Sequence, residues 1–124
     1  MNENSLELLA AFLEGRAALV RALESEASGL LHGGNDQKGY EAKMREKAAL
    51  LAALAEDAAP LLENMDDETA DALAPQLEAF SRSAANSLRV KSVFYMSALL
   101  YPEDYVDGAK NDLENFIDEV RRRA

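Results

Sequence analysis

Few side chains in this sequence have a type and spacing that could do chemistry. Acid–base catalysis most often uses histidine, and the only histidine, His32, precedes two glycines, where we expect a solvated turn. A di-metal site in a helical bundle needs Glu-x-x-His pairs on facing helices, which a single turn histidine cannot supply. We therefore predict that the chain is not an enzyme and binds no cofactor.

Two other groups of polar residues indicate weaker possibilities. One cluster of carboxylates could bind a hard cation, although we prefer to interpret it as a solvated helix start: Asp66, Asp67, Glu68 and Asp71. Five serines lie between residues 81 and 97, but no histidine lies near them in the sequence to act as a base. Cysteine and the glycine-rich phosphate-binding motifs are absent, so we predict no catalytic, cofactor-binding or metal site.

Composition and charge restrict the class of protein. The chain has 124 residues, of which 48% are apolar, and alanine and leucine dominate that share, so we expect one mostly helical domain. A formal net charge of -10 is opposite to that of nucleic-acid binders, which use clustered Lys and Arg. The longest uncharged apolar run, about residues 92–102, is shorter than the roughly 20 residues of a membrane span. With no cysteine and no signal-peptide pattern, we expect a cytoplasmic protein that neither binds nucleic acid nor inserts into a membrane.

The helices that carry these residues follow from the apolar spacing. Apolar residues alternate by three and four from Leu6 to Leu30 with an interruption at Arg16, a heptad seam that predicts a long helix ending in the turn at residues 32–36. A second seam runs from Tyr40 to Met65 and includes Lys47, and the short turn makes it antiparallel to the first. Pro60 lies inside this segment, where we expect a kink or a break.

A third helix and a tail complete the predicted fold. The helical period continues from Leu73 to Ala98, and Pro75 suits a first turn, so this helix is expected to begin near residue 74 and to end before Pro102. The tail, residues 104–124, has apolar residues on one face, a predicted Asn111 cap and Glu114 three positions later. We predict an all-α antiparallel bundle of three long helices plus a shorter C-terminal one, a single domain over residues 1–124. The sequence leaves open whether the tail docks on the bundle or moves freely.

One stretch differs in charge from the rest of the chain. No acidic residue lies between Glu78 and Glu103, whereas Arg82, Arg89 and Lys91 do, and residues 93–101 are apolar on nearly every side. The preferred interpretation is a central core helix. The alternative is a partner-binding surface that the tail covers and a client uncovers. The candidate partner-binding residues for that alternative are Leu88, Lys91, Phe94, Tyr95, Ala98, Leu99, Tyr101, Val106, Leu113, Phe116 and Val120.

The layout resembles the flagellar export chaperones of the FlgN and FliT type. The features that carry the resemblance are the turn at residues 33–36, the run Glu46-Lys47-Ala48-Ala49-Leu50-Leu51-Ala52-Ala53-Leu54 and Asn86 in the third helix. The resemblance implies a cytoplasmic chaperone that binds helical terminal segments of filament subunits and uses no cofactor. It also implies client contacts on the C-terminal helices, here from Leu88 to Val120. The alternative is a structural bundle that self-associates through residues 94–101.

Overall fold

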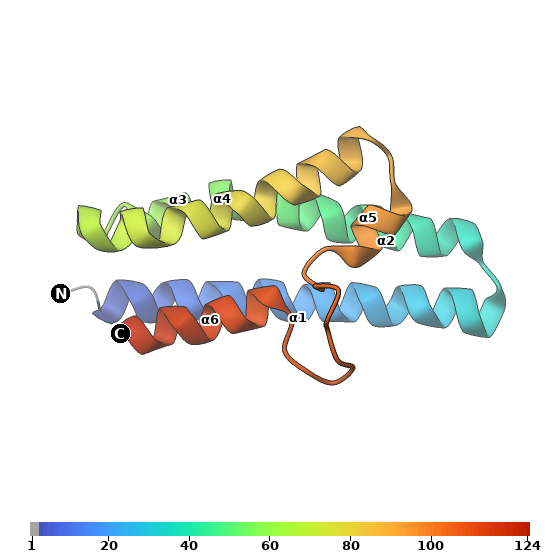
Figure 1. The fold of residues 1–124 in the computed structure, drawn as a ribbon, viewed down its shortest axis with the longest axis horizontal. Coiled ribbons are helices and arrows are strands. Elements are labelled where there is room, and N and C mark those ends of the chain that lie inside the picture. The colour runs from blue at the N-terminus through green and yellow to red at the C-terminus, as the bar shows by residue number, and fades with distance from the viewer. Residues whose placement is uncertain (1–2) are drawn as a thin grey trace.

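The computed structural model describes residues 3–124, and within them the chain forms six helices and no strand (Figure 1). The predicted all-α antiparallel bundle is therefore confirmed. The helices are α1 (Glu3–Gly34), α2 (Gln37–Ala52), α3 (Leu54–Leu62), α4 (Asp67–Arg89), α5 (Val93–Ala98) and α6 (Asp112–Arg123).

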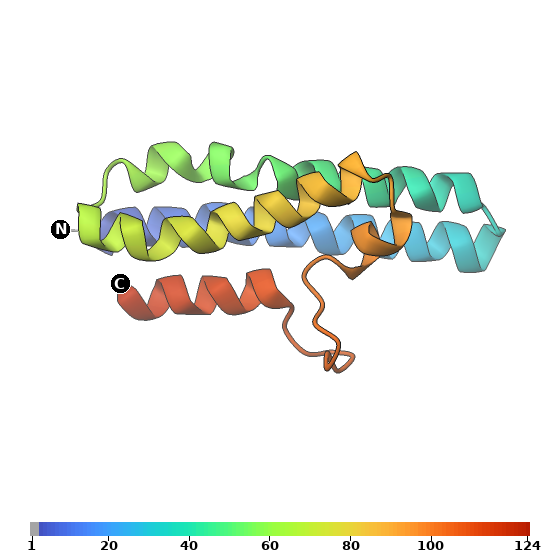
Figure 2. The ribbon, with the colours of Figure 1, turned by 45° about the horizontal axis from the view of Figure 1, so that its top comes forward.

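The first two predicted helices form an antiparallel hairpin that runs the length of the molecule (Figure 2). Asn35 closes the turn with a φ of 52°, and the Asp36 carboxylate caps α2 by accepting a bond of 2.9 Å from the Gly39 amide. Most residues of the two predicted seams are buried. The exceptions, all half-buried, are Leu23, Leu30, Tyr40 and Leu61. The turn end of the hairpin extends beyond the other helices (Figure 1).

The second predicted helix is interrupted at Ala53, not at Pro60. The Ser81 hydroxyl of α4 enters the gap, donating to the Leu51 carbonyl oxygen at 2.9 Å and accepting from the Ala55 amide at 2.9 Å. It thereby replaces the helical bond that would join these two residues, a recognised cause of helix interruption. Pro60 lies within α3, which continues to Leu62.

The third predicted helix differs from expectation at both ends. It begins at Asp67, where the Asp66 side chain accepts a bond of 2.8 Å from the Thr69 amide, so Pro75 lies in its interior rather than in its first turn. It ends at Arg89, well before Pro102. The Ser92 amide donates to the Ser87 carbonyl oxygen at 3.1 Å, and Lys91 takes a φ of 57°, a hydrogen-bonded helix end that usually uses glycine.

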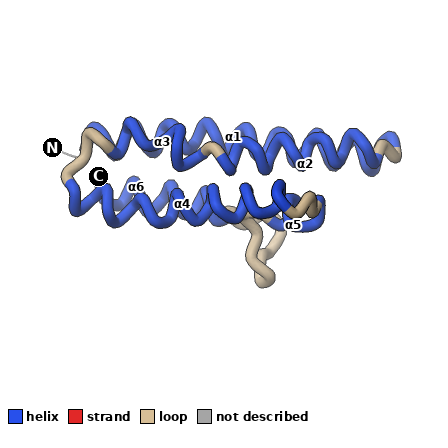
Figure 3. Tube along the Cα trace, turned by 90° about the horizontal axis from the view of Figure 1, so that it is seen from above, coloured by secondary structure: helices blue, strands red, loops and turns tan. Residues whose placement is uncertain are grey.

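The tail forms a docked helix on the bundle. α6 lies beside the N-terminal half of α1, and its end returns to the same end of the molecule as the α3–α4 turn (Figure 3). The predicted Asn111 cap is confirmed as a capping box with Glu114. The main core joins buried residues of α1, α3, α4 and α6, including Leu13, Leu54, Leu77 and Phe116.

Candidate partner-binding surface

α5 presents aromatic side chains to solvent. Phe94 is 74% exposed and Tyr95 is 53% exposed, and their ring centroids lie 6.0 Å apart. The core-helix interpretation of this segment is therefore wrong. The helix has only six residues, so it buries one face, through Met96, while the opposite face stays exposed. We call Val90, Phe94, Tyr95 and Ala98, all exposed, the α5 surface.

Exposed cations precede α5 in the chain, and a groove adjoins the α5 surface. Arg89 and Lys91 are exposed at the end of α4, and Arg82 is exposed two turns earlier. The groove has a volume of about 510 Å³ and is lined by α4, α5 and the segment after it: Ser83, Asn86, Tyr95, Ala98, Leu99, Leu100, Tyr101, Pro102 and Asp112. Asp112 is the one carboxylate among these lining residues. The groove lining contains no Lys or Arg, so the three cations lie outside it, on α4 and in the turn before α5.

The structure separates the candidate residues into three sets. Tyr95, Ala98, Leu99 and Tyr101 line the same groove, and Phe94 adjoins them through its ring contact with Tyr95. Leu88 is half-buried in α4, Lys91 lies in the exposed turn before α5, and Val106 is exposed in the loop before α6. The third set is buried in the core, where it is not accessible to a partner in this conformation: Leu113, Phe116 and Val120.

The tail leaves Phe94 and Tyr95 exposed, contrary to that alternative, although its start contacts the segment after α5, where the Asp112 amide donates to the Leu100 carbonyl oxygen at 2.9 Å. α6 packs along α1, and Phe116 reaches α4, where its ring meets Phe80 edge-on with centroids 5.8 Å apart. An ion pair between Arg121 and Glu14 joins its C-terminal end to α1. The apolar face of α6 is thereby satisfied by the bundle, and the α5 surface stays open.

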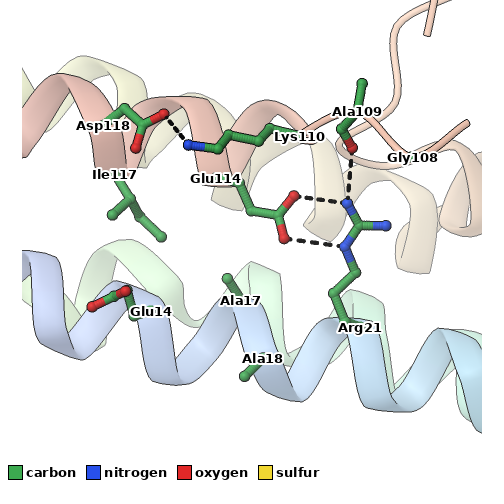
Figure 4. A pocket seen from close by; sticks show the side chains of 10 residues that line it. All are labelled: Glu14, Ala17, Ala18, Arg21, Gly108, Ala109, Lys110, Glu114, Ile117 and Asp118. Atoms are coloured by element: carbon green, nitrogen blue, oxygen red, sulfur yellow. Dashed lines mark hydrogen bonds and ion pairs between the residues drawn. The ribbon is translucent and has the colours of Figure 1, made fainter. Parts of the chain in front are cut away.

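The start of α6 is held by Arg21 of α1. Its Nε and Nη2 donate to the two carboxylate oxygens of Glu114 at 3.1 and 2.7 Å, and Nη2 also donates to the Ala109 carbonyl oxygen at 3.2 Å (Figure 4). This paired geometry raises the pKa of Arg21 and lowers that of Glu114. A hollow of about 420 Å³ lies between α1 and α6 here, with the Lys110–Asp118 ion pair on its α6 side (Figure 4).

A buried polar network lies under α5. Lys47 has no exposed surface, and its Nζ lies 2.9 Å from a Glu24 carboxylate oxygen and donates to the Ser97 carbonyl oxygen at 3.1 Å. The Tyr101 hydroxyl donates to Glu24 at 2.6 Å, and its ring lies 5.1 Å from Nζ. Burial lowers the pKa of Lys47 despite the nearby carboxylate, and burial together with Glu24 raises the pKa of Tyr101.

This network was not anticipated from the sequence, although Lys47 carried a signal. A lysine in a seam position otherwise filled by apolar residues requires a buried counter-charge, because an unpaired buried ammonium is costly. Glu24 and Lys47 supply that pair between α1 and α2, and through Ser97 and Tyr101 the pair fixes the end of α5. The network therefore positions the α5 surface instead of offering a reactive group.

Chemical groups for a reaction are sparse across residues 3–124. His32 is exposed near the end of α1, and within this part of the chain no three or more His, Asp or Glu side chains gather closely enough to hold a metal ion. None of the helices described is both long and apolar enough to span a bilayer.

Comparison with known proteins identifies no relative of this chain. The chain matches no protein-family model, no curated protein and no solved structure.

Proposed function

We propose that this protein is a small, non-enzymatic cytoplasmic chaperone that binds a helical segment of a client protein on the α5 surface. The observation that carries the proposal is the outward orientation of Phe94 and Tyr95, 74% and 53% exposed, in a stretch with no acidic residue. Aromatic residues are enriched at the centres of protein interfaces, where they contribute most of the binding energy.

The charges around this surface indicate the chemistry of the client. The whole chain carries a net charge of -10, yet residues 79–102, which include both exposed aromatic rings, carry Arg82, Arg89 and Lys91 and no acidic residue. An amphipathic helix with apolar anchors three and four residues apart fits the adjoining groove, and acidic residues on its flanks would meet these cations. A basic client segment would instead be drawn to the acidic remainder of the protein.

The resemblance to flagellar export chaperones supports the class of client. The long first helix, the glycine-containing turn and the antiparallel second helix are all present as α1, residues 33–36 and α2. In that group, clients contact C-terminal helices. Of the two helices that follow α4 here, α5 is the one that leaves large apolar side chains exposed. The proposed client is therefore the helical terminal segment of an exported filament subunit.

The test compares two exposed apolar sites of the same chain. The double variant Phe94→Asp/Tyr95→Asp removes the aromatic anchors, and Leu8→Asp changes an exposed leucine on α1 as the matched control. Each tagged protein is purified from its native cell, recovered subunits are identified, and the helical segment of any filament subunit is titrated as a synthetic peptide. We expect binding by the parent and the control, a loss of at least about tenfold in the double variant, and weaker binding at high salt.

Two outcomes would overturn the proposal. One is recovery of no helical exported subunit by the parent protein. The other is a peptide that binds the double variant as tightly as it binds the parent, which would move the site away from α5. Circular dichroism of each variant establishes that its helical content is unchanged before binding is compared.

A further inference from the structure

The loop between α5 and α6 has its two ends side by side. The Asp112 amide, at the start of α6, donates to the Leu100 carbonyl oxygen at 2.9 Å, so residues 101–111 form a closed loop that projects from the bundle (Figure 1). We call residues 99–102 the connecting segment. We propose that docked α6 holds the connecting segment in place and thereby completes the groove beside the α5 surface. This inference rests on the proposed function of that surface.

The connecting segment and α6 supply much of the groove. All four residues of the segment line it, as does Asp112 of α6, whereas α4 and α5 contribute two residues each. The groove therefore keeps its shape only while the segment and the start of α6 keep their positions. Movement of either would leave the lining residues of α4 and α5 without the opposite side of the groove.

Leu100 has a backbone conformation that depends on its surroundings. Its φ is 77°, in the left-handed region that is unfavourable for a residue with a Cβ. Such a conformation persists only where neighbouring contacts impose it. α6 supplies the hydrogen bond from Asp112, and the Leu100 side chain is buried in the same core cluster as Leu113 and Phe116. Without docked α6, we expect Leu100 to relax and to move the rest of the connecting segment.

Arg21 of α1 contacts both the connecting segment and α6. Its guanidinium carbon lies 5.7 Å from the centroid of the Tyr101 ring, while its nitrogens donate to Glu114 and to the Ala109 carbonyl oxygen. Tyr101 in turn donates to Glu24, about one turn further along α1. The same part of α1 therefore holds the connecting segment and the start of α6, so a movement of either one disturbs contacts of the other.

These contacts give the coupling between α6 and the groove a definite sign. Because the groove needs the docked tail, a ligand that binds in the groove must also stabilise the docking of α6. A tail that competed with the ligand would instead be released by it. Phe94 and Tyr95 are exposed while α6 is docked, so α6 does not occupy the α5 surface. We therefore expect a client to bind the tail-docked form and to hold α6 on the bundle.

α6 is placed so that it can open without unfolding the other helices. It is the last element of the chain, it follows a long loop, and it packs mainly on α1. Local opening of such terminal elements is common in native proteins and is detected by amide hydrogen exchange. If the inference is correct, the connecting segment opens in the same step as α6.

The first experiment measures amide hydrogen exchange, residue by residue, in the protein without a ligand. Ile117→Val removes one buried methyl group from α6, outside the groove, and should raise the exchange rates of α6 amides by about three- to tenfold. The amides of Leu99 and Tyr101, both hydrogen-bonded in the structure, should accelerate by the same factor. The matched control Ala58→Gly weakens α3 by a comparable amount and should leave all these rates unchanged.

Two results of the exchange experiment would overturn the inference. In one, α6 amides accelerate in Ile117→Val while Leu99 and Tyr101 keep the rates of the parent, so the connecting segment does not depend on α6. In the other, Ala58→Gly accelerates both groups as much as Ile117→Val does, so they open only when the whole bundle unfolds.

The second experiment measures binding of a labelled synthetic peptide by fluorescence anisotropy. The peptide is an amphipathic helix with leucines three and four residues apart and glutamates on its flanks. Ile117→Asp places a charge in the core and should undock α6, which lowers the affinity at least about tenfold. Asn115→Asp adds the same charge at an exposed position of α6 and should bind as the parent does. Bound peptide should also slow the exchange of α6 amides in the parent.

The outcomes of the binding experiment separate this inference from the proposed function. Equal affinity of Ile117→Asp and the parent would overturn the inference, and so would tighter binding by Ile117→Asp, which would show that the tail competes with the peptide. A peptide that does not bind the parent contradicts the proposed function, and the exchange experiment then decides alone whether α6 holds the connecting segment. Cooperative thermal unfolding of Ile117→Asp establishes that its remaining helices are folded.

Discussion

α5 and α6 are both short helices that follow α4, yet they differ in composition and in what they bury. α6 buries four large side chains against the bundle, namely Leu113, Phe116, Ile117 and Val120. α5 buries Met96 and exposes its two aromatic rings. α6 is long enough to place its apolar residues on one face and its charges on the other. α5 is apolar on nearly every side, so whichever face docks, another is left in water. Apolar density alone therefore does not decide burial.

The largest expected difference in the free energy of unfolding is between variants of one phenylalanine from each helix. Phe116→Ala should lower the free energy of unfolding by about 3–5 kcal/mol, because it opens a cavity beside Phe80. Phe94→Ala, at a side chain that is mostly exposed, should change it by no more than about 0.5 kcal/mol. Urea unfolding followed by circular dichroism measures both values. Similar losses of stability in the two variants would show that the Phe94 ring is packed in solution, which would contradict the proposed difference between α5 and α6.

A smaller effect is expected from the network that fixes α5 without touching α6. Lys47→Ala should cost about 3 kcal/mol, since it leaves Glu24 largely buried without its counter-charge. Lys43→Ala is the matched control, because Lys43 on the same helix forms only partly exposed ion pairs, so this variant should change the free energy of unfolding much less.

Hydrogen exchange would locate the effect of Lys47→Ala. The Ser97 carbonyl oxygen loses a donor in this variant, so amides of α5 should exchange faster than in the parent, relative to those of α6. Uniform acceleration across both helices would instead indicate a global loss of stability with no specific role in positioning α5.

The smallest expected effect uses acid to loosen α6 selectively. Arg21 lowers the pKa of Glu114 below its ordinary value of 4.5, so the stabilisation is present above pH 4.5 and is lost as the pH falls through the lower, folded-state pKa. For a partly exposed pair we expect at most about 1 kcal/mol.

Thermal unfolding of the parent and of Glu114→Gln across this range measures that contribution. The variant should lose less stability on acidification than the parent does, and the difference should appear in hydrogen exchange of α6 before α5, whose residues 93–98 include no carboxylate. An identical pH dependence in both proteins would contradict the assignment. Dilute samples are needed, because the pI is near 4.5.

Periodicity was sufficient to predict the helices that bury one regular face. The seams from Leu6 and Tyr40, the antiparallel hairpin and the Asn111 cap are all local patterns, and the structure confirms them. The end of α4 was not predicted, because Lys91 and not glycine adopts the left-handed conformation that ends the helix. The residue type at this position therefore did not indicate a helix end.

The interactions that hold α5 and α6 on the bundle join residues that are distant in sequence. Arg21 and Glu114 are 93 positions apart, and Glu24 and Tyr101 are 77 apart. Only Lys47 carried a local signal, since a charge in a seam position needs a partner, but the seam does not say which carboxylate supplies it. The exposure of Phe94 also depends on where α4 ends, which the sequence alone did not indicate.

Ser81 ties two parts of the molecule into one folding unit. Its hydroxyl bonds to both the Leu51 carbonyl oxygen and the Ala55 amide, the two groups that would bond to each other in an uninterrupted helix from residue 37 to residue 62. The interruption at Ala53 therefore depends on a contact made by α4 and cannot be a property of α2 and α3 alone. A serine on one helix thus sets the shape of another.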